Sequence, residues 1–379
     1  MKVLICVRKM SSGGTEILES RLAVELNKTN IYADLLGQYD LGFVDSQQDV
    51  TRWEEKGVPK VLWLKSNSFL SIVSAVYRLI NIIRSNKYSY VITTNTGLDT
   101  IASIARVFVK FKHIVALHSS PHPSIVKRLR FRLWEKLASK SLYKGYAISE
   151  FVKQSNLKYL NVAADKISVI YNSIDLDTFT KPINEEDKSK IDQIKEIKGK
   201  KLLFIGRLIQ SKGIDILLKL LAQLPDDVSL IIAGDSFDKA IEEGAANYRD
   251  EIISIIKQLQ LEERVVLLGQ CKEIYTIMSQ CDVLVHLPRH EGFGLVLLEA
   301  FAANLPVVTS NIGGIPEVIK NTSYKAINLD DTDGLLAEID RLLSIDASEK
   351  LILTQQAKNT LEYFSDKRRA KDIVEKVLI

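Results

Sequence analysis

Cysteine is scarce in this sequence of 379 residues, which contains only Cys6, Cys271 and Cys281. None of them forms a CxxC pair, and three thiols cannot all pair with one another, so a disulfide scaffold is excluded. We expect buried thiols in a reducing compartment. Apolar residues make up 46% and charged residues 26% of the chain, which argues against long disorder and collagen-like repeats.

Long apolar runs are also missing. No run approaches the ~18 to 20 residues that a membrane-spanning helix needs. The opening segment Met1–Val7 is too short for a signal peptide and is followed at once by Arg8 and Lys9. We therefore expect a cytoplasmic protein.

The net charge of +4 is the sum of two unequal halves. Residues 1–175 hold 25 Lys and Arg against 14 Asp and Glu, a balance of +11, whereas residues 176–379 hold 26 against 33, a balance of −7. At ~100 to 200 residues per domain, the length predicts two domains. The charge difference indicates that the first of them meets something anionic.

Short β-branched runs alternate with longer helical patterns, which is typical of parallel α/β layering. The strands expected in the front half are Val3–Val7, Tyr32–Leu36, Lys60–Leu64, Tyr90–Thr94, His113–Leu117, Gly145–Ile148 and Ile167–Ile170. Those in the rear half are Lys201–Ile205, Val228–Ala233, Arg264–Leu268, Asp282–His286, Pro306–Thr309 and Tyr324–Ile327. Apolar strands without clean alternation imply sheets covered on both faces. We predict an α/β protein of two Rossmann-like doubly wound domains that face each other across a cleft.

Two charged segments flank the rear half. Lys181–Lys200 has eleven Lys, Asp and Glu among its residues, and we interpret it as a solvated linker with some helix and not as a core element. Asp366–Leu378 has the pattern of a charged amphipathic helix, and the pattern alone does not assign it to a domain.

A glycine pair follows the first expected strand. Gly13 and Gly14 lead into the helical pattern Thr15–Asn27. Glycines let a backbone approach a phosphate closely, and a helix start offers free N–H groups. Because a full GxGxxG is absent, a plain strand-to-helix turn remains the alternative.

Two cations follow the first strand of the rear half. The strand ends at Gly206, and Arg207 and Lys212 lie in the turn before a helix. Open α/β sheets bind ligands at the carboxyl ends of their strands. Arg offers forked contacts to phosphate oxygens and Lys a mobile point charge. We interpret the pair as phosphate-binding, with two ordinary surface cations as the alternative.

Two glutamates bracket a turn and a helix. Glu299 is the only charge from Gly292 to Ala303, and a carboxylate buried there needs donors such as ribose hydroxyls. Glu291 stands eight residues earlier, at most ~12 Å away if the segment is helical. A separation of this size suits two carboxylates that bind the two ends of one extended ligand. It exceeds the ~5 to 9.5 Å between the paired carboxylates of glycosidases, so a hydrolase is disfavoured. The alternative is that each carboxylate only caps backbone groups close to it in the sequence.

The histidines give weaker signals. His118 ends an expected strand and precedes a Ser-Ser-Pro turn. Its side chain either faces a cleft or makes a structural hydrogen bond. His286 lies inside a strand pattern and is interpreted as a core residue. Neither His113 nor His122 has partners at metal-ligand spacing, so no bound metal is expected.

The stretch Lys127–Lys144 holds seven cations and one acid, interleaved with Leu, Phe and Trp at helical spacing. A basic amphipathic helix of this kind lies on an anionic bilayer. An ordinary surface helix is the alternative. Nucleic acid is not an expected partner, because no binding motif accompanies the patch.

Taken in this order, the segments resemble the retaining glycosyltransferases of family 4, which adopt the GT-B fold. The resemblance covers nearly the whole chain and is densest from Gly145 to Val318. Besides the loops above, it rests on Ala147–Glu150, Val169–Asp175 with Phe179, Ala233–Asp235 and Gly313–Glu317.

The resemblance implies a role for each motif residue. It implies an acceptor-side domain of residues 1–175, to which the C-terminal helix 366–379 returns, and a nucleotide-sugar domain of residues 176–365. The donor's diphosphate would be held by Arg207 and Lys212 and approached by Gly13 and Gly14. Glu299 would bind ribose hydroxyls, and His118 would lie near the reacting sugar. The transferred sugar would meet Glu291 and the backbone N–H groups of Gly292, Phe293 and Gly294.

The expected activity is therefore transfer of a hexose from a UDP- or GDP-linked donor to an acceptor hydroxyl, with retention and with no metal or cofactor. The basic front half favours a lipid-linked saccharide acceptor in cell-envelope polysaccharide synthesis and a peripheral position on the inner face of the cell membrane. A glycosyltransferase with a soluble acceptor is one alternative. A non-catalytic nucleotide-sugar-binding module is the other.

Overall fold

The computed structural model describes residues 1–8, 14–38, 51, 53–64, 69–121, 136–176, 185–235, 243–272 and 274–379. They form two compact units: unit 1 comprises Met1–Ser173 and Ser365–Ile379, and unit 2 comprises Ile174–Phe364. The domain borders expected at 175 and 365 lie within two residues of these. Within the described ranges, no helix has both the length and the apolar character to cross a membrane.

Unit 1 is built on a parallel sheet with the strand order β3-β2-β1-β4-β5-β6-β7. Its strands are β1 Lys2–Val7, β2 Tyr32–Gly37, β3 Val61–Trp63, β4 Tyr90–Thr93, β5 Lys112–Leu117, β6 Leu142–Ala147 and β7 Ile167–Val169. Its helices are α1 Gly14–Asn27, α3 Phe69–Asn86, α4 Thr96–Ala105, α7 Glu150–Leu157, η1 Ala164–Lys166 and α16 Asp366–Ile373, which continues into η5 Val374–Leu378.

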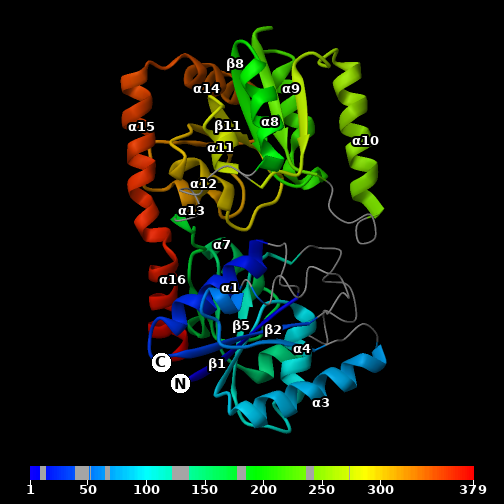
Figure 1. Cartoon of the computed structure of the whole chain (residues 1–379), viewed down its shortest axis with the longest axis vertical. Helices are drawn as coiled ribbons and strands as arrows, with labels where there is room; N and C mark the ends of the chain where they lie inside the picture. The colour runs from blue at the N-terminus through cyan, green and yellow to red at the C-terminus, as the bar shows by residue number, and fades with distance from the viewer. Residues whose placement is uncertain are drawn as a thin grey trace. The chain divides into compact units, whose positions relative to one another are not determined.

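Strand β1 shows why this sheet is covered on both faces. Successive side chains of a strand point to opposite faces. Val3 and Ile5 pack with α1 and α16, whereas Leu4 and Cys6 pack with α3 and α4. Figure 1 shows α1 and α16 apart from α3 and α4. Burial of Cys6 raises the pKa of its thiol far above the ordinary value. This agrees with the buried thiol expected there.

The C-terminal helix belongs to unit 1. Helix α16 packs on α1, more than 300 residues earlier in the chain (Figure 1). Ile373 and Val377 are fully buried in the same core as β1, and Tyr90 Oη donates a hydrogen bond of 2.7 Å to the carbonyl oxygen of Leu378. The apolar stripe of the amphipathic pattern is therefore a core face of the first sheet.

Unit 2 repeats the architecture with the parallel order β10-β9-β8-β11-β12-β13. Its strands are β8 Lys200–Ile205, β9 Val228–Ala233, β10 Val265–Gly269, β11 Val283–His286, β12 Val307–Ser310 and β13 Ala326–Ile327. Its helices are α8 Glu185–Glu196, η3 Gln210–Lys212, α9 Ile214–Leu221, α10 Glu243–Gln258, α11 Ile274–Met278, α12 Leu295–Ala302, α13 Ile315–Ile319, α14 Thr332–Ser344, α15 Ala347–Asn359 and η4 Thr360–Phe364. The predicted pair of doubly wound domains is confirmed.

Helix α8 shows that the linker prediction for Lys181–Lys200 was wrong. Ile191 and Ile194 of this helix are buried in unit 2. Asp187 is also buried and accepts a hydrogen bond of 2.6 Å from the backbone N–H of Lys272. Two isoleucines three positions apart make an apolar stripe, which is enough to dock a helix whose other faces are charged.

The cationic stretch Lys127–Lys144 is not one helix throughout. Residues 127–135 lie outside the described residues, and residues 136–141 are helical. Strand β6 then begins at Leu142, and Lys144 pairs with Ile114 of β5. The prediction that the helix includes Lys144 was wrong, because the segment from Leu142 completes the sheet.

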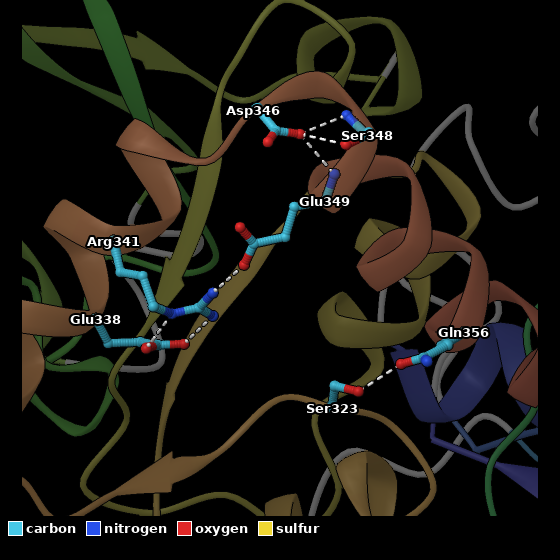
Figure 2. Close-up of polar contacts among 7 residues, drawn as sticks. All are labelled: Ser323, Glu338, Arg341, Asp346, Ser348, Glu349 and Gln356. Carbon is cyan, nitrogen blue, oxygen red and sulfur yellow. Dashed lines mark hydrogen bonds and ion pairs between the residues drawn. The ribbon is translucent and has the colours of Figure 1, made fainter.

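The corner between α14 and α15 shows how charged side chains fix helix ends in unit 2 (Figure 2). Asp346 precedes α15, and its carboxylate accepts hydrogen bonds of 2.8 Å from the backbone N–H groups of Ser348 and Glu349. Arg341 of α14 bridges Glu338 at 2.8 Å and Glu349 at 3.0 Å. Asp346 thus supplies an acceptor for N–H groups at the start of α15 that have no partner inside the helix. The Arg341 ion pairs link the side chains of α14 and α15.

Candidate functional site

The strand order of unit 2 locates a ligand crevice. The chain runs from β8 outward to β9 and β10, then returns to place β11 on the other side of β8. Open α/β sheets bind ligands beyond the carboxyl ends of the two strands where the order reverses. The loops at that point are 206–213 after β8 and 287–294 after β11, and they hold most of the predicted site residues.

Lys212 and Glu291 are in contact across these two loops. Lys212 Nζ donates to Glu291 Oε2 at 2.7 Å, and both side chains are about four-fifths buried, with 21% and 17% exposed. The other oxygen of Glu291 accepts hydrogen bonds from the backbone N–H groups of Gly292 at 3.0 Å and Phe293 at 3.4 Å. The structure thus brings together four of the residues that the sequence nominated.

His286 is a third member of this cluster, and the sequence analysis missed that role. It is buried in β11 as predicted, yet its Nε2 lies 3.5 Å from Glu291 Oε2. Burial lowers the pKa of His286 despite the nearby carboxylate. Burial alone would raise the pKa of Glu291, but His286 and Lys212 together hold it well below its ordinary value. Glu291 is therefore an ionised acceptor at neutral pH.

Arg289 fastens the two loops to each other. Its guanidinium makes a forked contact with Asp215, at 2.7 Å and 2.6 Å, and its Nη1 donates to the Gln210 carbonyl oxygen at 2.9 Å. Tyr248 Oη donates a further hydrogen bond of 2.9 Å to Asp215. Burial acts to raise the pKa of Asp215, but Arg289 and Tyr248 outweigh it and the pKa is lowered. The ion pair therefore holds the segment that carries Lys212.

Gly213 lets the loops approach this closely. Its φ of +71° lies in the left-handed region, and a Cβ there would meet the Leu287 carbonyl oxygen at 2.0 Å. Only glycine fits such a position without displacing the backbone. Gly294, with φ +98°, makes the corresponding turn into α12.

The remaining candidates of unit 2 occupy the same loops and helix. Arg207 is exposed in the loop after β8, five residues before Lys212. Glu299 is half-buried on α12, the helix that starts after Gly294. Their contacts with a donor remain predictions.

In unit 1, His118 directly follows β5 and joins a buried charge cluster. His118 Nε2 lies 3.0 Å from Glu19 Oε1, and Tyr146 Oη donates to Glu19 Oε2 at 2.8 Å. Arg369 of α16 donates a short hydrogen bond to Glu19 as well. The sequence analysis nominated only His118 of these four.

The charge cluster keeps Glu19 ionised although it is fully buried. Burial alone would raise the pKa of Glu19, but Arg369, His118 and Tyr146 lower it to about 2. The carboxylate therefore gives His118 a fixed negative neighbour.

Of the two glycines nominated in the first loop, Gly14 begins α1 and Gly13 lies outside the described residues. Across the described part of the chain, no three His, Cys, Asp or Glu side chains lie grouped as metal ligands do.

Comparisons with known proteins identify the family. The model described as "Glycosyltransferase Family 4" matches residues 12–178, and the model described as "Glycosyl transferases group 1" matches residues 185–360. Among curated proteins, an uncharacterized glycosyltransferase of Methanocaldococcus jannaschii is 30% identical over 60% of this chain and 57% of its own length. This chain therefore spans a little over half of that relative.

A second relative has a named activity. It is the N-acetylgalactosamine-N,N'-diacetylbacillosaminyl-diphospho-undecaprenol 4-alpha-N-acetylgalactosaminyltransferase of Campylobacter jejuni, 28% identical over 73% of each chain.

Among solved structures, Anabaena HepE in complex with UDP and glucose matches all of this chain and 99% of its own, with a TM-score of 0.83 and 22% identity. The sucrose-phosphate synthase of Thermosynechococcus elongatus matches 99% of this chain and 98% of its own, with a TM-score of 0.80 and 18% identity. These likenesses show the GT-B fold. Because the two family models together span nearly the whole sequence and the fold agrees, the chain belongs to glycosyltransferase family 4.

Proposed function

We propose that this protein transfers a sugar from a nucleoside diphosphate sugar to an acceptor hydroxyl, with retained anomeric configuration and without a metal. The observation that carries the proposal is the contact of Lys212 with Glu291 at the crevice of unit 2. A cation suited to phosphate and a carboxylate suited to sugar hydroxyls therefore meet at one point of the crevice. That point is where the bond between sugar and diphosphate would lie.

The physical task is to stabilise the negative charge that grows on the departing diphosphate. Lys212 and Arg207 supply positive charge there, and Arg289 with Asp215 keeps Lys212 in place before the donor arrives. Charges fixed in advance stabilise a transition state without reorganising during the reaction. The N–H groups of Gly292 and Phe293, which now bind Glu291, lie beside the same point.

Retention follows from the same arrangement in this proposal. Glu291 is occupied by a lysine and two N–H groups, so it is a poor nucleophile. We propose attack from the face that the diphosphate leaves. The acceptor oxygen forms a bond to the anomeric carbon, the bond from that carbon to the phosphate oxygen breaks, and the hydroxyl proton passes to that phosphate oxygen.

The proposed acceptor is a lipid-linked saccharide of cell-envelope polysaccharide synthesis, met at the cytoplasmic face of a membrane. Support comes from the basic residues 1–175 and from relatives named for such reactions. The C. jejuni relative acts on a diphospho-undecaprenol, and the O-antigen chain mannosyltransferase of Salmonella typhimurium is 30% identical over 55% of this chain. UDP is the first donor to test, because HepE was solved with UDP-glucose.

The test is a panel of UDP- and GDP-sugars with lipid-linked and soluble acceptors, scored by release of nucleoside diphosphate and by mass spectrometry of the product. Lys212→Ala and Glu291→Gln are expected to lower kcat/KM at least a hundredfold, in line with loss of one charge-stabilising group. Lys219→Ala on α9 is the matched control, and it should retain full activity. Near-normal kcat/KM in both site variants contradicts the proposal, and tight donor binding without turnover favours the non-catalytic module.

A further inference from the structure

An open hollow of about 1110 Å³ lies at the edge of unit 1 opposite to His118. Its walls come from the ends of α3 and α4 and from residues at the start of β4, β5 and β6, among them Tyr90, Lys112 and Ser141. His118 stands beyond the other end of β5. Five residue steps at about 3.3 Å each separate the two ends of that strand by ~17 Å. The hollow is therefore a different site from the proposed catalytic one.

The described residues that line the hollow include six cations and no carboxylate. The six are Arg84, Lys87, Arg106, Lys110, Lys112 and Lys140. A concave surface with charge of one sign attracts ions of the opposite sign strongly. The hollow is therefore suited to an anion.

The cations divide into fixed and available groups. Arg106 Nη1 donates to the Ser141 carbonyl oxygen at 2.5 Å, Arg84 donates to the Phe108 carbonyl oxygen at 2.8 Å, and Lys112 donates to two tyrosine hydroxyls at 3.1 Å. By contrast, Lys87, Lys110 and Lys140 are exposed. They form no ion pair with any carboxylate that the structure describes.

Two large apolar side chains stand exposed beside this charge. Val107 lines the hollow and is 78% exposed, and the adjacent Phe108 is 59% exposed. Both follow α4, and the Phe108 carbonyl oxygen is held by Arg84. Apolar tips next to lysines match the layering of a bilayer surface, where acyl chains adjoin charged headgroups.

We propose that this hollow binds the phosphate-bearing headgroup of an anionic phospholipid while Val107 and Phe108 enter the acyl boundary. Lys87, Lys110 and Lys140 contact the phosphate. The inference rests on the proposed work at a membrane but not on the chemistry of sugar transfer. It assigns the membrane contact to the amino ends of β4–β6, whereas the basic stretch alone placed it at Lys127–Lys144.

The experiment is sedimentation with phosphatidylcholine vesicles, with and without phosphatidylglycerol. We compare the full chain with the triple variant Lys87→Gln, Lys110→Gln, Lys140→Gln. At roughly fivefold per lysine near an anionic surface, the triple variant should bind the anionic vesicles on the order of a hundredfold more weakly. The matched control is Lys158→Gln, Lys198→Gln, Lys358→Gln, which removes the same charge from exposed positions elsewhere. It should bind almost as the parent does.

A second variant separates lipid from free phosphate. Val107→Ser with Phe108→Ser should weaken vesicle binding several-fold but leave any binding of soluble glycerol phosphate unchanged. Equal vesicle binding by the two triple variants overturns the proposal. So does binding of glycerol phosphate at the hollow without any preference for anionic vesicles. Donor turnover in detergent with a short-chain acceptor reports the proposed function separately, and the lysine triple variant should leave it unaltered.

Discussion

Arg369→Met is the change in unit 1 whose effect follows most directly from the structure. Arg369 is almost fully buried on α16 and faces the fully buried Glu19 of α1. Met fills a similar volume but carries no charge. The variant therefore leaves a buried carboxylate whose remaining contacts are Tyr146 and His118.

The pKa of Glu19 sets the size of the effect. It is lowered from the usual 4.5 to about 2, because Arg369, His118 and Tyr146 outweigh the opposing effect of burial. At about 1.4 kcal/mol per pKa unit, the ionised cluster contributes about 3 kcal/mol. This stabilisation is present above pH 4.5 and is lost as the pH falls toward 2. At pH 7 we expect Arg369→Met to lose about 3 to 5 kcal/mol, as for other broken buried ion pairs.

The pH dependence distinguishes this explanation from a simple loss of packing. Without Arg369, burial raises the pKa of Glu19 above its ordinary value, so the carboxyl binds a proton as the pH falls from 7. Protonation removes the unpaired buried charge. Calorimetric melting at pH 7 and pH 5 should therefore show a smaller difference from the parent at pH 5.

Two controls accompany this measurement. Arg368→Met removes a neighbouring arginine whose partner Asp372 lies on the exposed side of the same helix, and it should cost no more than about 1 kcal/mol. Glu19→Gln with Arg369→Met should recover much of the loss, because no charge is then buried alone. Equal losses at both pH values, or a double variant no more stable than Arg369→Met, would refute the reasoning.

Two further predictions concern the crevice of unit 2. Arg289→Leu releases Asp215 and the loop that carries Lys212. Steady-state kinetics should therefore show a several-fold higher KM for the donor, and Arg289→Lys should give an intermediate KM. An unchanged KM would contradict the role of Arg289 in holding this loop. Gly213→Ala places a Cβ 2.0 Å from the Leu287 carbonyl oxygen at a φ of +71°, so it should lower the free energy of unfolding by about 2 kcal/mol or more. Gly57→Ala also has a positive φ, +97°, but open space surrounds it. It should therefore cost only about 1 kcal/mol. Thermal melting of the two variants checks this difference, and equal melting temperatures would count against it.

The strands were predictable because buried parallel strands have a local signature. Val228–Ala233 is buried on both faces, with Ser229 as its one polar residue, and was located without error, since helices cover both sides of such a sheet. The contact of Lys212 with Glu291 was also within reach, because both lie after strands of one sheet. The local sequence pattern did not predict the packing of α8, because charged residues surround Ile191 and Ile194, whose side chains are buried.

The missed functional residues depend on contacts between distant parts of the chain. Glu19 and Arg369 are 350 residues apart, and each looks like an ordinary surface charge in its own amphipathic helix. Asp215 and Arg289 are 74 residues apart. His286 could be assigned to the core from its strand, but its contact with Glu291 depends on how the following loop turns back. No local periodicity encodes such pairings.

The return of the chain to unit 1 after residue 365 has a consequence for synthesis. On the ribosome, every residue of unit 2 emerges before Ile373 and Val377, whose side chains complete the core beneath β1. Domains generally fold as they emerge, so unit 2 can reach its native state while the first sheet still exposes the apolar strip that α16 later covers. Nascent chains halted before residue 365 should therefore recruit holdase chaperones through unit 1, and release from them should coincide with the appearance of the final helix.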